Sequence, residues 1–186
     1  KKLYGVEDYQ SLNQEAQQLP PGSEGLIVQE HFQGNRTPHT DPLSRGVFHG
    51  LTLKHERAHL YRAVIEGVAF GSELILETMR NNGFEPDRIV MAGGATRSPL
   101  WLQIHADVSN LPLTITKVPD APSLGCAILA ATGAGLFPDV PTATKQMVQI
   151  DGLVEPDPDI HKLYQPYYEN YKETYHSLKK LRMGLG

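Results

Sequence analysis

The sequence has little cysteine and no long apolar run. Cys126 is the one cysteine among 186 residues, so no disulfide forms within the chain, and this usage predicts a reducing, cytoplasmic location. No segment reaches the roughly 18 consecutive apolar residues that a membrane-spanning helix needs. The first residues, 1–5, contain neither an initiator Met nor an apolar signal region. We therefore expect that the chain starts within a longer sequence.

An excess of basic charge is also missing. Seventeen Lys and Arg stand against 21 Asp and Glu, which gives a formal net charge of −4. This balance argues against binding to nucleic acid or to an anionic membrane, because neutralising phosphates requires clustered basic side chains. Hydrophobic residues make up 40% and charged residues 20%, a composition that favours a folded domain over disorder. The length fits one domain or one lobe of a larger protein.

The hydrophobic patterns alternate between the helical and the strand period. A polar loop at 33–42 contains two prolines and a glycine, and long loops inside compact domains are often functional. The order of the remaining elements indicates an α/β layer fold. We predict helices at 6–19, 56–79, 99–110, 123–133 and 161–181, and strands at 25–28, 47–51, 88–92 and 113–116.

Three local features carry structural predictions. Ala63, Gly67 and Gly71 recur every four residues, and two glycines on one helix face predict close approach of another backbone, because glycine otherwise costs about 1 kcal/mol there. The helix at 123–133, opened by Ser123, is almost wholly apolar or small, so we expect it to be buried on most sides. Tyrosines and leucines repeat at helical spacing in the last helix, which suggests packing.

The turn at Gly93-Gly94-Ala95-Thr96-Arg97 follows a predicted strand, and Ser98-Pro99 after it is a favoured cap and first-position pair for a helix. Such a turn aims backbone N–H groups and a positive helix end at one point, and the glycines allow a ligand to approach the main chain. A plain turn that uses glycine for its dihedral angles explains the pattern equally well. Neither Gly-x-Gly-x-x-Gly nor a P-loop is present.

Other candidate groups favour ordinary structural explanations. His55 and His59 lie four residues apart, but without a third ligand a pair at a helix start is favoured over a zinc site. Arg36 and Arg45 flank the polar loop, where they would either meet a phosphate or carboxylate or hold the loop. Glu66 is expected to be a partly buried structural carboxylate. Cys126 is expected to lie in the core.

Longer spaced patterns resemble one family. Gly46-x-Phe48-x-Gly50-Leu51, seven residues, then His59-Leu60-x-x-Ala63-Val64-Ile65-Glu66 is similar to the signature of the C-terminal domain of FGGY carbohydrate kinases. The segment 93–98 resembles the adenosine motif of that family, and 120–127 resembles its next block. The loop at 32–38 is most similar to the pentulose branch, the ribulose and xylulose kinases. The resemblance covers nearly the whole chain.

The resemblance implies a fold and also implies which parts of the active site this chain contains. The family fold has two actin-like lobes of the ribonuclease H type, with ATP between them, so residues 1–186 would be the C-terminal, nucleotide-binding lobe: a mixed sheet with flanking helices, incomplete at its N-terminal side. The family's sugar site, first phosphate loop and catalytic aspartate belong to the N-terminal lobe, and no Asp-x-Gly-Thr loop occurs here. This chain alone would be inactive.

The implied reaction transfers the γ-phosphoryl group of ATP to a sugar or polyol hydroxyl, with a ketopentose as the expected acceptor and Mg²⁺ held by ligands mainly outside this chain. By resemblance, Gly93, Gly94, Ala95, Arg97 and Ser98 would hold the adenosine, with Ser98 forming a hydrogen bond to the ribose or base. The missing N-terminal lobe would be the partner, and the Tyr-rich helix would pack on that lobe or form a homodimer face. A stand-alone, non-catalytic actin-like nucleotide-binding module is the alternative, followed by a purely structural domain.

Overall fold

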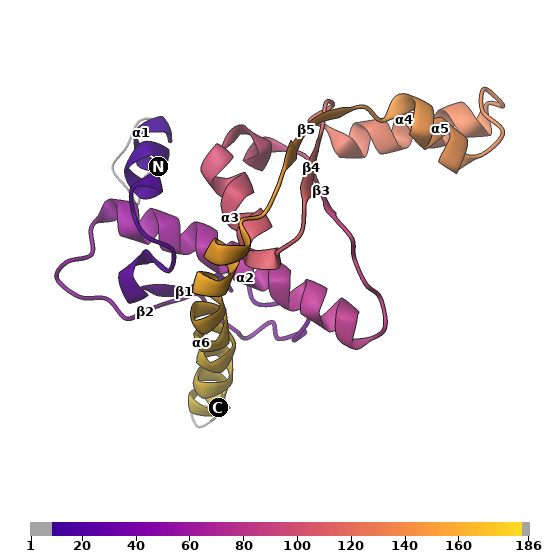
Figure 1. Cartoon of the computed structure of the whole chain (residues 1–186). Helices are drawn as coiled ribbons and strands as arrows, with labels where there is room; N and C mark the ends of the chain where they lie inside the picture. The colour runs from indigo at the N-terminus through magenta and orange to yellow at the C-terminus, as the bar shows by residue number, and fades with distance from the viewer. Residues whose placement is uncertain (1–8, 184–186) are drawn as a thin grey trace.

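The computed structural model describes residues 9–183 of the chain (Figure 1). It is an α/β fold with a small mixed sheet and flanking helices. In chain order the elements are α1 (Gln10–Gln17), η1 (Ser23–Gly25), β1 (Ile27–Gln29), β2 (Val47–His49), α2 (Arg57–Asn81), β3 (Ile89–Met91), η2 (Gly94–Arg97), α3 (Pro99–Ser109), β4 (Leu113–Thr116), α4 (Ala121–Gly133), α5 (Val140–Met147), β5 (Ile150–Val154) and α6 (Pro158–Met183).

Two sheets form the β part of the structure. β1 and β2 pair antiparallel, with Val28 opposite Phe48. β3 and β4 pair parallel, with Val90 opposite Thr114, and β5 pairs antiparallel with β4. One face of the three-stranded sheet packs on α3 through Leu102, Ala106 and Leu113. The other face is open: Val90 is 58% exposed. The apolar run at 88–92 is typical of a buried strand, but none of its residues is fully buried, because nothing described here covers that face.

The main core lies where α2, α3 and α6 meet. Helix α6 buries Tyr164, Tyr168, Tyr171 and Tyr175, and three of these rings surround Phe70 of α2 at centroid distances of 5.8–6.1 Å. The predicted packing role of the Tyr-rich helix is therefore confirmed within the chain itself. The buried stripe is shifted relative to the predicted one, since Leu163 is exposed and Tyr167 only half-buried.

The close approach predicted from the small-residue stripe of α2 is confirmed. A Cβ atom at Gly67 would overlap the carbonyl oxygen of Val28, and one at Gly71 would overlap the carboxylate of Glu30. At Gly67 the backbone of β1 thus lies directly against α2, which requires the missing side chain, whereas the neighbour of Gly71 is a side chain. A buried ion pair strengthens the same helix: Arg62 Nε donates to Glu66 Oε1 over 2.8 Å, and Glu66 also accepts from Gly22 N at 3.0 Å and Ser23 Oγ at 2.7 Å.

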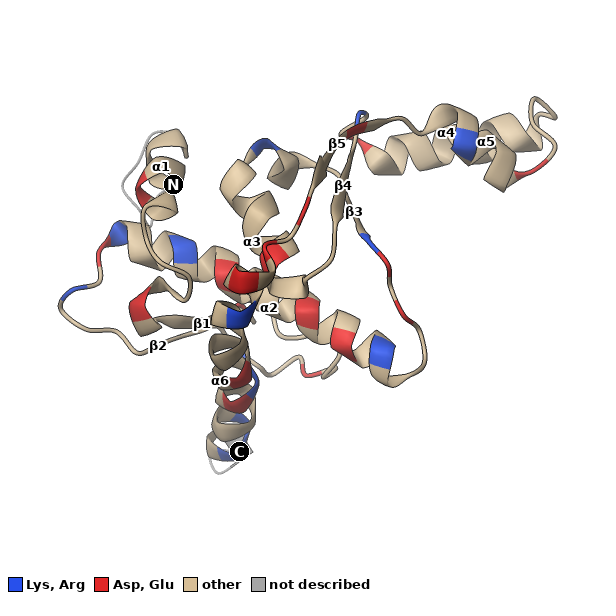
Figure 2. Ribbon diagram, viewed as in Figure 1, with Lys and Arg blue, Asp and Glu red and all other residues tan. Residues whose placement is uncertain are grey.

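Helix α4 departs from its prediction. It begins at Ala121, not Ser123, because Asp120 accepts a hydrogen bond from Ser123 N (3.1 Å) and caps the helix. It is also not buried on most sides: Ile128 is its one buried residue, and Leu129 is 61% exposed. Figure 1 shows α4 and α5 together extending away from the core, and α4 contains no charged residue, unlike α6 (Figure 2). An apolar sequence alone therefore does not show that another element packs against α4.

Several boundaries differ from those predicted. The predicted helix at 6–19 is observed as α1, and residues 6–8 lie outside the described residues. Helix α5 and strand β5 were not predicted. Helix α6 begins at Pro158 rather than residue 161. None of the helices within residues 9–183 is long and apolar enough to cross a membrane.

Candidate nucleotide-binding site

The two glycines of the turn after β3 are used differently. Gly93 has φ +92° and ψ −164°, a backbone conformation that is essentially restricted to glycine. Gly94 opens η2 with no positive φ, and a Cβ atom built on it would meet nothing within 4 Å. The backbone dihedral angles therefore explain why residue 93 is a glycine. They do not account for Gly94, whose missing side chain leaves an open surface beside the main chain.

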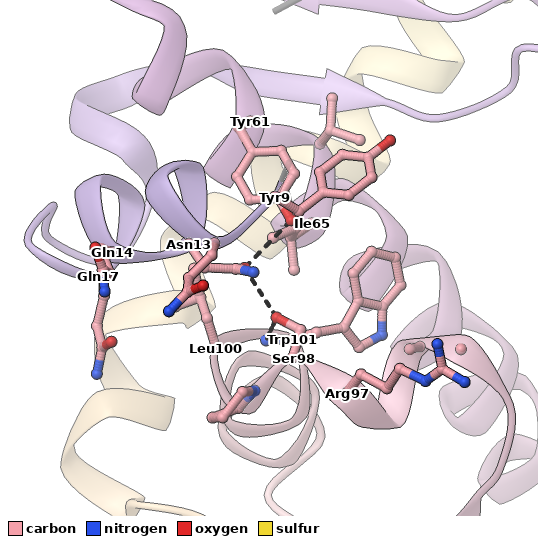
Figure 3. A pocket seen from close by; sticks show the side chains of 15 residues that line it. Tyr9, Asn13, Gln14, Gln17, Tyr61, Ile65, Arg97, Ser98, Leu100 and Trp101 are labelled. Carbon is pink, nitrogen blue, oxygen red and sulfur yellow. Dashed lines mark hydrogen bonds between the residues drawn. The ribbon is translucent and has the colours of Figure 1, made fainter. Parts of the chain in front are cut away.

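Ser98 fixes the end of this turn to two other helices. As predicted, it caps α3: its Oγ accepts from Trp101 N at 3.3 Å, with Pro99 at the first helical position. The same hydroxyl donates to Asn13 Oδ1 of α1 over 2.9 Å. Asn13 Oδ1 also accepts from Tyr61 Oη of α2 at 3.2 Å. Three helices far apart in sequence are thus joined at one amide oxygen (Figure 3).

A cavity of about 910 Å³ opens between α1, the first half of α2 and the turn. Figure 3 shows its labelled side chains converging from these elements. Its lining includes aromatic rings, a row of amides, and the turn itself: Tyr9, Gln10, Asn13, Gln14, Gln17, Tyr61, Val64, Ile65, Gly94, Ala95, Arg97, Ser98, Pro99, Leu100 and Trp101. Ligand sites in proteins commonly combine apolar walls with a few polar groups in this way.

The electrostatics of the cavity favour a ligand with neutral hydrogen-bonding groups near its wall. Arg97 is the one charged side chain among the lining residues that the structure describes. Burial raises the pKa of Tyr61, so its hydroxyl keeps the proton that it donates to Asn13. Behind Trp101, burial lowers the pKa of His105 to about 4, and this ring stacks on the indole at a centroid distance of 5.0 Å. A neutral His105 therefore supports Trp101 from the protein side.

The structure brings together four of the five residues predicted for the adenosine. Gly94, Ala95, Arg97 and Ser98 line the cavity, whereas Gly93 lies at the start of the turn and does not. The amides of α1 were missed. Their spacing at positions 10, 13, 14 and 17 places them on one helix face, a signal present in the sequence but not connected to the turn, because Ser98 and Asn13 are 85 residues apart.

Comparison with known proteins decides the family. Residues 3–134 match the model of the C-terminal domain of the FGGY family of carbohydrate kinases. The chain belongs to the FGGY family. This confirms the resemblance drawn from the signature at 46–66, and with the solved relatives below it confirms the fold class, an actin-like α/β lobe of the ribonuclease H type.

Several FGGY relatives are xylulose and ribulose kinases. The chain is 37% identical over 164 residues to a xylulose kinase of Staphylococcus epidermidis, covering 88% of this chain and 33% of that protein. It is 35% identical over 177 residues to a ribulokinase of Bacillus licheniformis, covering 92% and 32%. A ligand-bound xylulose kinase from Lactobacillus acidophilus has 31% identity and a TM-score of 0.84, covering 93% of this chain and 35% of that one. The chain thus spans about a third of the length of these relatives.

The other candidate groups of this FGGY domain have structural partners. His59 Nδ1 accepts from Glu56 N at 3.1 Å and so caps α2, while His55 Nδ1 accepts from Thr52 N at 2.9 Å. The helix-start explanation of this pair is confirmed. Within residues 9–183, no group of three or more His, Cys, Asp or Glu side chains is placed to hold a metal ion.

Of the predictions for Arg45, Glu66 and Cys126, some are confirmed and one is wrong. Arg45 donates to the carbonyl oxygens of Pro42 and Ser44 at 2.9 and 2.8 Å, so it holds the polar loop, through carbonyls rather than carboxylates. Glu66 is structural, as predicted, but it is fully buried rather than partly buried. The prediction that Cys126 lies in the core is wrong, because its thiol is exposed on α4.

Proposed function

We propose that residues 1–186 form the C-terminal, nucleotide-binding lobe of an ATP-dependent sugar kinase, and that the cavity beside Gly94 holds the adenosine of ATP. The observation that carries this proposal is Gly94 itself. Neither its backbone conformation nor its neighbours require glycine, yet it lies in the wall of a cavity of about 910 Å³ that also contains aromatic and amide side chains. A flat ligand packed on the main chain explains the missing side chain.

The residues present fit a nucleoside. The absent Cβ at Gly94 leaves room for a ring face or a ribose, and the amides of α1 offer both donors and acceptors to a heterocyclic base. Gly93, Ala95 and Arg97 complete the proposed subsite, with Gly93 shaping the turn. The proton of Ser98 is donated to Asn13, so a hydrogen bond between this hydroxyl and the ligand would be one that Ser98 accepts, and its main proposed role is to position the turn and α3.

The proposed reaction is transfer of the γ-phosphoryl group to a hydroxyl of a ketopentose. Xylulose and ribulose are the candidate acceptors, since relatives named for kinases of these sugars are 35–37% identical to this chain. Phosphoryl transfer depends mainly on positioning and on neutralising phosphate charge, which Mg²⁺ supplies. We propose that the ligands of Mg²⁺ lie mainly outside this chain. The ion, the sugar and the catalytic base would be held by a partner N-terminal lobe, in a cytoplasmic enzyme.

The test is a kinase assay of the intact protein with ATP and each of the two pentuloses. We expect Gly94→Val to raise the KM for ATP at least tenfold, with the KM for the sugar unchanged. Gly133→Val is the matched control, because a Cβ at Gly133 also meets nothing within 4 Å but lies on α4, away from the cavity. An unchanged KM for ATP in Gly94→Val would refute the assignment. Binding of ADP without turnover of any sugar would favour a non-catalytic nucleotide-binding module.

A further inference from the structure

The side chain of Asn13 carries an inference that goes beyond the family assignment and rests on the proposed nucleotide site. We propose that Asn13 Nδ2 donates a hydrogen bond to an acceptor atom of the bound nucleoside, a ring nitrogen of the purine or a ribose oxygen. Asn13 would then be a specificity-determining residue on α1, a helix that contributes none of the residues predicted for adenosine binding. Its role follows from how its amide is held.

The oxygen of this amide is fully engaged. Oδ1 accepts from Ser98 Oγ at 2.9 Å and from Tyr61 Oη at 3.2 Å, which uses both of its lone pairs. The direction of the Ser98 bond follows from the cap: Ser98 Oγ accepts from Trp101 N and therefore has its own proton to give. Burial keeps Tyr61 protonated, so this hydroxyl also donates. Two hydroxyl donors orient the amide with its oxygen toward α2 and α3.

The nitrogen of the same amide is left available. Nδ2 forms no hydrogen bond with any residue in the range 9–183, although Asn13 is half-buried and lines the cavity together with Gly94 and Ala95. Its two N–H groups are therefore donors held in one orientation by three helices. A donor fixed before binding loses little entropy when a ligand arrives, and it discriminates against a ligand that offers no acceptor there.

The central variant is Asn13→Asp, tested in the intact protein by steady-state kinetics. Aspartate keeps an oxygen that accepts from Ser98 and Tyr61 but removes both N–H donors. We expect the KM for ATP to rise about tenfold, the usual effect of losing one hydrogen bond to a ligand, with no change in the KM for the sugar. Gln18→Glu is the matched control, because it adds the same charge at the end of the same helix, at an exposed position that does not line the cavity.

A second measurement uses the unmodified side chain. In protein labelled with ¹⁵N-asparagine, the side-chain amide signal of Asn13 is identified as the one that is absent from the spectrum of Asn13→Asp. In the wild-type protein this signal should shift when ADP is added, and its amide hydrogens should exchange with solvent more slowly. Equal KM values for ATP in Asn13→Asp and Gln18→Glu, or an Asn13 amide signal unmoved by saturating ADP, would overturn the inference. If Gly94→Val still weakens ATP, the nucleotide site stands and only the role of Asn13 is lost. If neither variant affects ATP, the proposed function fails as well.

Discussion

The two adjacent glycines of the turn should respond oppositely to the same substitution. At Gly93, alanine must adopt φ +92° and ψ −164°, which costs about 1–3 kcal/mol. At Gly94 the backbone has no positive φ and the new methyl group meets nothing within 4 Å. Alanine there restricts only the unfolded chain, which stabilises the protein by about 0.4–1 kcal/mol. Since the same unfolded-state gain partly offsets the strain at Gly93, the two variants should differ by about 1–3 kcal/mol.

Urea denaturation of the intact protein measures this difference through the transition midpoint at an unchanged slope. Gly93→Ala should unfold at lower urea than wild type, and Gly94→Ala at the same or higher urea. This result would show that Gly94 can be substituted without harming the fold, so that a loss of ATP affinity at that position reports on the ligand. Equal destabilisation by both substitutions would refute the reasoning, because Gly94 would then also be required by the fold.

Two further predictions concern buried carboxylates. Glu66→Leu should destabilise the protein by about 3–5 kcal/mol, because it leaves the Arg62 guanidinium buried without its 2.8 Å partner. The double variant Arg62→Met with Glu66→Leu should be less destabilised than Glu66→Leu alone. A destabilisation of under about 1 kcal/mol by Glu66→Leu would contradict this reasoning. Burial raises the pKa of Glu30 to about 7 from 4.5. The folded state therefore holds this proton more tightly than the unfolded state, and the resulting stability, present below pH 4.5, is lost as the pH rises to about 7. Glu30→Gln should gain about 3 kcal/mol relative to wild type across that range, as measured by denaturation at pH 4.5 and 8; parallel pH profiles would contradict it.

Much of the fold follows from local chemistry in the sequence. Ser98-Pro99 predicts the start of α3 because the cap needs only neighbouring backbone groups, and it forms as expected. The stripe at Gly67 and Gly71 predicts a close backbone, which at Gly67 proves to be β1. Such features depend on residues a few positions apart, so a single sequence is sufficient to find them.

The failures concern contacts that sequence periodicity does not encode. Helix α4 is apolar, but apolar composition does not establish that another element covers it, and Cys126 and Leu129 are exposed. Helix α5 and strand β5 were missed although Asp139 caps α5, because both elements are short and interrupted by proline or glycine. The amides of α1 could not be joined to the turn, since only the packing of α1 on α2 and α3 brings Asn13 to Ser98.

The central claim is that the turn after β3 and helix α1 together hold the adenosine of ATP. A crystal structure of the intact protein with ADP tests it most directly. We predict that the adenosine lies in the cavity with a face or its ribose against Gly94 and an acceptor atom within hydrogen-bond distance of Asn13 Nδ2. ADP bound with its adenosine in contact with neither Gly94 nor Ala95 would contradict the proposed site.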